Sequence, residues 1–240
     1  MEGARGAHPP KYITSPSIDM FTELQKLASG HIVILTLAPE TDGAFPLISF
    51  ASENGVVVSL GHHVADDAVL SQAVESGARS CTHLGNGMPD MINRHQNPLW
   101  WQLACDKLYG MFITDGHHLP ADFIQVALRA KTVEKFIVVS DATSIAGLPP
   151  GTYDFHGSKV KLAPSGRISF EDTPYLAGSS AIMLQCMNYL ASLHVLNESE
   201  LWKVGFDNPL ALLGKDPHSF HKHGDTAVEM HKDRFVVSEQ

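Results

Sequence analysis

The sequence predicts an α/β fold in which consecutive βα units build a parallel sheet. Short segments rich in β-branched residues recur along residues 31–143, and segments with helical patterns separate them. The first of these segments, HIVILTLAPE (31–40), is apolar throughout instead of alternating with polar residues. Such a run is typical of a strand that is buried on both faces of a parallel sheet.

Each element has its own local signal. Residues 19–28 are amphipathic and stop before Gly30, and residues 64–78 carry Asp66 or Asp67 as an N-cap and Gly77 as a terminator. Pro120 stands near the start of another helix. The predicted strands cover residues 31–40, 55–63, 78–84, 109–118 and 135–143, and the predicted helices between and before them cover 19–28, 64–78, 98–108 and 120–130.

The pattern changes after the fifth strand. Residues 152–170 are polar, rich in turn residues and alternating, which predicts an antiparallel hairpin or meander. Helical patterns return at 179–193 and 198–205, and a short helix at 208–214 is expected to be capped by Asn208. The tail, 226–237, is expected to form two short strands around a Lys-Asp turn.

Composition limits the classes of partner. The formal net charge of −9 argues against nucleic acid or an anionic membrane as the main partner. No run of about 18 apolar residues is present, so no transmembrane helix is expected. The N-terminal MEGARGAHPP lacks the pattern of a secretory signal, and three cysteines without CxxC spacing fit a reducing cytoplasm.

A titratable residue stands at or near the end of each of the five predicted strands. These residues are Glu40, His62, His83, His118 and Asp141. Active-site residues of parallel α/β proteins, and of (β/α)8 barrels especially, lie at the carboxyl ends of strands. Ionisable groups are costly to bury there unless they are paired or bind a metal. The set of five therefore predicts a functional site.

The residue types indicate a reaction class. One carboxylate and two neutral imidazoles form a zinc-type ligand set that leaves a fourth position for water. A metal in such a site lowers the pKa of its water and polarises a carbonyl. Asp141 could then take the proton from the water and pass it to a leaving group. The expected chemistry is metal-assisted hydrolysis of an amide or an ester.

The stretch THLGNGM (82–88) leads from His83 directly into Gly85, Asn86 and Gly87. A Gly-Asn-Gly sequence permits positive φ, so a tight surface turn is one interpretation. The other is a loop that passes close to a ligand, with His83 facing the same ligand.

Seven short motifs stand in order along the chain: RGAHPPKYI (5–13), TLAPE (36–40), SLGH (59–62), THLGNGMP (82–89), TDGHH (114–118), SDAT (140–143) and LAGSS (176–180). Taken together, these motifs resemble the N-acetylglucosamine-6-phosphate deacetylase family of the amidohydrolase superfamily. Within the motifs the chain departs from the family pattern in two places: HVAD follows SLGH where the family usually has Ser-Asn-Ala, and Gly87 replaces the usual alanine. The C-terminal segment departs as well, with HSFHKHGDTAVEM in place of a usual family strand.

The resemblance implies roles for the strand-end residues. Glu40, His62 and His83 would hold a divalent metal, zinc by preference, and Asp141 would act first as general base and then as general acid. The reaction implied is removal of the acetyl group from N-acetylglucosamine 6-phosphate. The product would be glucosamine 6-phosphate, in amino-sugar catabolism in the cytoplasm.

The resemblance also implies a substrate-binding set. His118 would place the substrate carbonyl, Ala177 would contact the substrate from the LAGSS loop, and Asn86 with the backbone of Gly87 would bind the sugar phosphate. Arg94 falls where the family places a phosphate-binding arginine, which often reaches into the partner subunit of a homodimer. A guanidinium group matches a phosphate with two parallel hydrogen bonds.

The implied architecture is a (β/α)8 barrel of the metal-dependent hydrolase type, present with about five of its strands. The expected segments are a partial barrel with the metal site (1–150), a β-hairpin or meander insertion (151–175), remaining barrel helices (176–214) and C-terminal strands of a small β-sandwich (215–240). The first three barrel strands would be missing, so the open sheet would expose its edges. The chain is then expected to be a fragment, a truncated paralogue or half of an assembly.

Two alternatives remain open at the level of sequence. One is another metal-dependent amidohydrolase, such as a deaminase or a cyclic amidase, which would not need the phosphate-side placement of Asn86 and Arg94. The other is a non-catalytic homologue that folds only with a partner chain.

Overall fold

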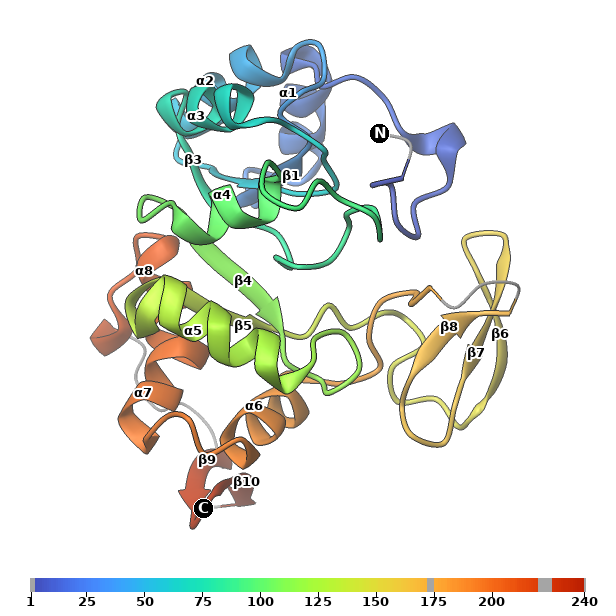
Figure 1. Cartoon of the computed structure of the whole chain (residues 1–240), viewed down its shortest axis with the longest axis vertical. Helices are drawn as coiled ribbons and strands as arrows, with labels where there is room; N and C mark the ends of the chain where they lie inside the picture. Colours follow the sequence, from blue (N-terminus) through green and yellow to red (C-terminus); the bar gives the residue numbers. More distant parts are fainter. Residues whose placement is uncertain (1–2, 172–174, 220–225, 240) are drawn as a thin grey trace. The chain divides into compact units, whose positions relative to one another are not determined.

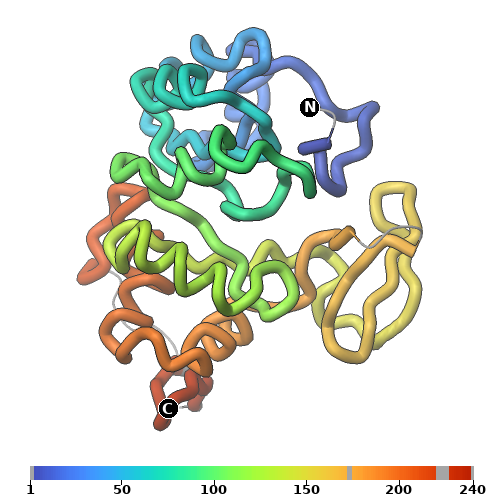
Figure 2. Tube along the Cα trace, viewed as in Figure 1, coloured from blue at the N-terminus to red at the C-terminus, as the bar shows by residue number. Residues whose placement is uncertain are grey.

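The computed structural model describes residues 3–171, 175–219 and 226–239. The chain divides into two compact units, Met1–Met111 and Phe112–Gln240. Figure 2 traces the backbone from the first unit, in blue to green, into the second, in green to red. Among the helices of the described residues, none combines the length and the apolar character that a membrane crossing requires.

The main sheet has the strand order β1-β2-β3-β4-β5, which is also the order in the sequence. Parallel ladders join β1 to β2, β2 to β3 and β3 to β4. This order confirms the predicted βα units. The strands are β1 (Ile34–Leu37), β2 (Val57–Leu60), β3 (Ala78–Cys81), β4 (Tyr109–Ile113) and β5 (Phe136–Val139).

Three of the first unit's described α-helices, all except α2 (Ala44–Glu53), begin at side-chain caps. The side chains of Ser17, Asp66 and Asn97 each accept a hydrogen bond from a backbone N–H three residues further on. A 3₁₀ turn, η1 (Pro10–Tyr12), precedes the helices α1 (Ile18–Leu27), α2 (Ala44–Glu53), α3 (Asp67–Glu75) and α4 (Pro98–Ala104) (Figure 1). Helix α2 was not among the predicted elements.

The second unit contains α5 (Ala121–Lys135), which is interrupted at Thr132, and α6 (Met183–Ser192). It continues with α7 (Glu198–Trp202), the π-helical turn η2 (Lys203–Asp207), α8 (Asn208–Leu212) and the 3₁₀ turn η3 (Pro217–Ser219).

The cap prediction for Asn208 was wrong. Asn208 is helical and buried, and its side chain donates hydrogen bonds to the carbonyl oxygens of Val133 and Phe136 at 2.6 and 2.7 Å. The chain runs from α7 through the π turn into α8 without a break, so no N-terminus exists there for Asn208 to cap.

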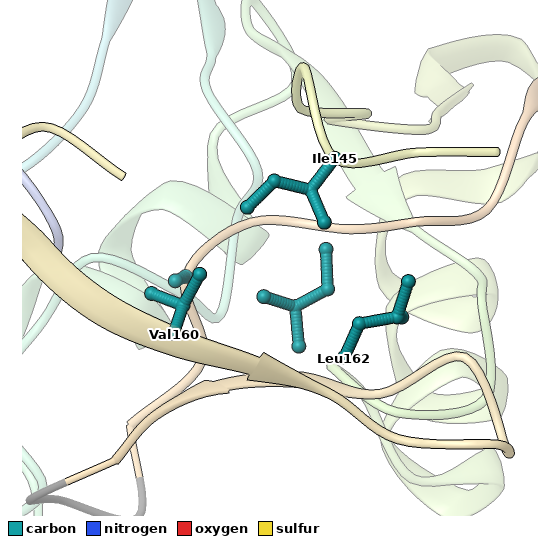
Figure 3. Close-up of a cluster of buried hydrophobic side chains, with 5 residues drawn as sticks. Ile145, Val160 and Leu162 are labelled. Carbon is teal, nitrogen blue, oxygen red and sulfur yellow. The ribbon is translucent and has the colours of Figure 1, made fainter. Parts of the chain in front are cut away.

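The predicted antiparallel elements are both present. Strands β6 (Gly151–Phe155), β7 (Ser158–Leu162) and β8 (Ile168–Phe170) form a meander, which encloses a small apolar core with Ile145, Val160 and Leu162 (Figure 3). Strands β9 (Thr226–His231) and β10 (Arg234–Glu239) form the predicted hairpin. The side chain of Asn188 on α6 bonds both the N–H and the C=O of Phe235.

The prediction that the first strand is fully buried was wrong. Val33 and Ile34 are 49% and 39% exposed, whereas all four residues of β2 are buried. The reason is position in the sheet, because β1 is the outermost strand of the order and β2 lies inside it. An apolar run alone does not distinguish an edge strand from a central one.

Candidate functional site

Three of the five strand-end residues have left-handed backbone. The φ angles are 56° at His62, 30° at His83 and 50° at Asp141. Side chains other than glycine rarely adopt this region, and each such residue costs about 1–3 kcal/mol unless the surrounding structure fixes it. The strands end before these residues, and three of the eight non-glycine residues with positive φ in the described part of the chain are strand-end positions that the sequence selected.

The imidazoles of His62 and His83 face each other. Their Nε2 atoms are 2.9 Å apart and the two rings are almost perpendicular, at 89°. The Nδ1 atom of His62 lies 2.8 Å from the carbonyl oxygen of Ala4, so Nδ1–H donates to that carbonyl. The Nε2 atom of His62 then carries the lone pair. Metal-ligating histidines show this arrangement, in which the other ring nitrogen donates to a carbonyl or a carboxylate.

The carboxylate of Glu40 is held separately. Its Oε1 atom accepts a hydrogen bond from the N–H of Val64 at 2.8 Å. Its Oε2 atom is buried and makes no hydrogen bond within the described residues. The described part of the chain contains no group of three or more His, Cys, Asp or Glu side chains placed for one metal ion. The two imidazoles, with Nε2 atoms 2.9 Å apart, could bind one cation between them. The structure does not bring Glu40 into one group with them.

The Gly-Asn-Gly loop passes directly beside the two imidazoles. A Cβ atom added at Gly87, where φ is +62°, would lie 2.9 Å from both His62 Nδ1 and His83 Cε1. Asn86 carries a buried amide nitrogen with no hydrogen-bond partner among the described residues. The residues that line a small pocket here include Gly61, His62, Thr82, Asn86, Gly87 and Gln102. The loop therefore lines the same small pocket as His62 and is not an isolated surface turn.

The N-terminal segment packs against His62, and this contact was not predicted from the sequence. Ala4 is fully buried, and the ring of His8 meets the ring of His62 edge to face with centroids 4.6 Å apart. A Cβ atom at Gly6 would lie 3.0 Å from His62 Cε1. The RGAH stretch was the available signal, but nothing local in it indicates a partner 58 residues away.

His63 lies beside the pair and is buried. Its Nε2 atom is 2.6 Å from the side-chain nitrogen of Gln102 on α4. Burial, and then the charge of His62, lowers the pKa of His63 to about 4. His63 is therefore neutral near pH 7, and its contact with Gln102 ties the loop after β2 to helix α4.

In the second unit, Asp115 organises His118. The Oδ1 atom of Asp115 accepts from the backbone N–H groups of His117 and His118, at 2.8 and 2.9 Å. Its Oδ2 atom accepts from His118 Nδ1 and from Ser179 Oγ, both at 2.8 Å. Burial by itself raises the pKa of Asp115. The hydrogen bonds and charge of His118, with the backbone N–H of His117, outweigh burial and hold the pKa well below its usual value.

Asp141 is fixed through its backbone. Its carbonyl oxygen accepts from the N–H of Ser179 at 3.0 Å, and the N–H of Thr143 donates to the Ser179 carbonyl at 2.9 Å. Ala177 is fully buried in the apolar core of the meander, and its N–H donates to Ile168. The side chain of Ala177 is therefore used for packing.

Arg94 is exposed, and its carbonyl oxygen accepts from the indole N–H of Trp100 at 3.2 Å. The first unit therefore contains Arg94 together with Glu40, His62, His83, Asn86 and Gly87, and the second contains His118, Asp141 and Ala177.

Comparison with known proteins confirms the resemblance. The chain is 31% identical over 233 residues to N-acetylglucosamine-6-phosphate deacetylase of Bacillus subtilis, covering 97% of this chain and 57% of that protein. It is 28% identical to N-acetylgalactosamine-6-phosphate deacetylase of Escherichia coli O157:H7, covering 88% and 55%. No protein-family model matches the chain.

The fold is that of the same enzymes. The crystal structure of N-acetylglucosamine-6-phosphate deacetylase from Thermotoga maritima superposes with a TM-score of 0.80 at 27% identity, covering 89% of this chain and 57% of that one. The predicted fold, part of an amidohydrolase (β/α)8 barrel, is confirmed. The chain spans about half the length of the relatives that it matches.

Proposed function

We propose that this chain removes the acetyl group from N-acetylglucosamine 6-phosphate by metal-assisted hydrolysis, giving glucosamine 6-phosphate and acetate. The observation that carries the proposal is the pair of strand-end imidazoles, with Nε2 atoms 2.9 Å apart beside the Gly85–Gly87 loop. Similarity to deacetylases of two hexosamine phosphates supports the same substrate class. A cytoplasmic location follows from that class of substrate.

His62 and His83 would hold a divalent cation, and we propose zinc because two imidazoles with one carboxylate form a common zinc ligand set. We assign Glu40 as the third ligand, since its Oε2 atom is buried and makes no hydrogen bond within the described residues. When bound, such a cation activates water and polarises the acetyl carbonyl.

The reaction needs one proton transfer in each direction. Asp141 would take a proton from the attacking water as the C–O bond forms. It would return the proton to the sugar nitrogen as the amide C–N bond breaks. His118, which Asp115 orients through its Nδ1 atom, would contact the substrate and help to place its carbonyl.

The phosphate would be bound by Asn86, the backbone of Gly87 and the guanidinium of Arg94. Because Arg94 is exposed, its proposed use is at the phosphate of a partner subunit in a homodimer. The loop that contains Ala177 would contact the sugar through its backbone, because the Ala177 side chain is buried in the meander core.

The test is acetate release from N-acetylglucosamine 6-phosphate by the purified chain supplied with zinc. Turnover that is lost in Asp141→Asn supports the proposal. A panel with N-acetylgalactosamine 6-phosphate and unphosphorylated amides separates this reading from a deaminase or a cyclic amidase. A folded chain that binds metal and releases no acetate would favour a homologue that needs a partner chain.

A further inference from the structure

Both oxygens of the Asp115 carboxylate are fully used within the second unit. Oδ1 accepts two backbone N–H groups, and Oδ2 accepts His118 Nδ1–H and the hydroxyl of Ser179. The side chains of His118 and Asp115 are 6% and 2% exposed. A buried carboxylate with four donors has one orientation, and it holds the imidazole of His118 in one tautomer.

The direction of the Ser179 hydroxyl is determined by its neighbours. The N–H of Ala181 donates to Ser179 Oγ at 3.0 Å, so the single hydroxyl hydrogen is directed to Asp115. Ser179 is 2% exposed, so water does not compete for this hydrogen bond.

The backbone of Ser179 is also hydrogen-bonded to the backbone of Asp141. The N–H of Ser179 donates to the Asp141 carbonyl, and the Ser179 carbonyl accepts from Thr143, while Ala142 and Ser179 form a parallel bridge. These bonds flank the left-handed residue Asp141, whose conformation needs such support.

We propose that Ser179 is a positioning residue that fixes His118 through Asp115 and Asp141 through its backbone. Its hydroxyl thereby acts on His118, which in the proposed function places the substrate carbonyl. Its backbone acts on Asp141, which in the proposed function transfers the proton. The proposal rests on that function for the meaning of His118 and Asp141. The hydrogen-bond network itself does not depend on it.

Asp115 also acts electrostatically on the Cys186 thiol of α6. Burial, and then the charge of Asp115, raises the pKa of Cys186 to about 12. The thiol is therefore neutral over the working range of pH, and the charge of Asp115 acts on His118.

The test compares Ser179→Ala with Ser180→Ala in the full chain. Ser180 stands next in the same loop, but its hydroxyl donates to the carbonyl of Gly166 and not to Asp115. The first measurement records ¹⁵N spectra of each variant with labelled histidines across pH, and the missing signal in His118→Gln identifies His118. The second measurement is acetate release, which gives kcat and KM.

In Ser179→Ala we expect kcat to fall at least about tenfold, as for loss of a hydrogen bond to a charged group, with a smaller change in KM. The ¹⁵N signals of His118 should shift, because the carboxylate that accepts its Nδ1–H has one donor fewer. Ser180→Ala should match the unaltered chain in both measurements.

Unchanged His118 signals in Ser179→Ala, or equal effects of the two variants, would overturn the proposal. So would a Ser179→Ala chain that does not fold while Ser179→Thr folds, since the hydroxyl would then serve structure alone. If the unaltered chain releases no acetate, the proposed function fails, and the histidine spectra still decide the role of Ser179.

Discussion

His62 donates its Nδ1–H to the carbonyl oxygen of Ala4 across 2.8 Å, and Ala4 is fully buried. The N-terminal segment thereby selects the ring nitrogen of His62 that faces His83. A backbone carbonyl does this without adding charge to the site.

Removal of residues 1–8 should weaken retention of a divalent cation by about 10–100-fold, the usual cost of losing a partner behind a metal-ligating histidine. Competition with a coloured chelator measures this. Lys11→Ala, at an exposed position just beyond the deletion, is the control and should bind as the unaltered chain does. Equal affinity in the deleted chain would show that Ala4 has no part in metal binding.

Substitutions of the three proposed ligands should differ in effect. His62→Ala and His83→Ala should each abolish tight metal retention, because each removes one of the two facing Nε2 atoms. Glu40→Gln keeps a side-chain oxygen for Val64 N–H and removes only the charge. Metal content after dialysis decides the role of Glu40. A large loss supports Glu40 as a third ligand, and an unchanged content would mean that Glu40 serves only to hold the loop at Val64.

Gly87→Ala should destabilise the first unit more than Gly55→Ala. Both glycines have left-handed backbone, at +62° and +77°, but a Cβ at Gly55 meets nothing within 4 Å, whereas one at Gly87 presses on both imidazoles. Backbone strain should cost about 1–3 kcal/mol in each variant, and crowding adds to it only at Gly87. Urea unfolding gives both values, and equal losses would mean that the imidazoles move aside freely.

Stability of the second unit should depend on acid pH through Asp115. The folded-state pKa of Asp115 lies below its ordinary value of about 3.9, so its stabilising contribution is present above about pH 4. That contribution is lost as pH falls from about 4 towards the lower folded-state pKa. Urea unfolding at pH 7, 4.5 and 3 should show a steeper fall for the unaltered chain than for Asp115→Asn. Parallel pH profiles of the two chains would contradict this.

The sequence was sufficient where the signal is local. Apolar runs located all five strands, and the predicted cap at Asp66 is a side chain that bonds within its own first turn. Helix α2 was missed, although its buried residues Ala44, Leu47, Ile48 and Ala51 have helical spacing. Asn208 was misread because its partners, Val133 and Phe136, come from distant sequence.

The same limit applies to the site. Strand ends pointed to His62 and His83, which the fold does bring together. The contacts that orient functional side chains were not readable, since Ala4 lies 58 residues from His62 and Ser179 lies 64 residues from Asp115. Only tertiary structure creates such pairs.

The left-handed backbone at His62, His83 and Asp141 has a consequence for how this chain would drift under mutation. Glycine adopts that conformation without steric cost, whereas another residue there costs about 1–2 kcal/mol. A library of variants selected only for folding should therefore accumulate glycine at these three positions. Two imidazoles and a carboxylate at these positions therefore cost folding stability that glycine would not cost, so ease of folding does not explain why they stand there.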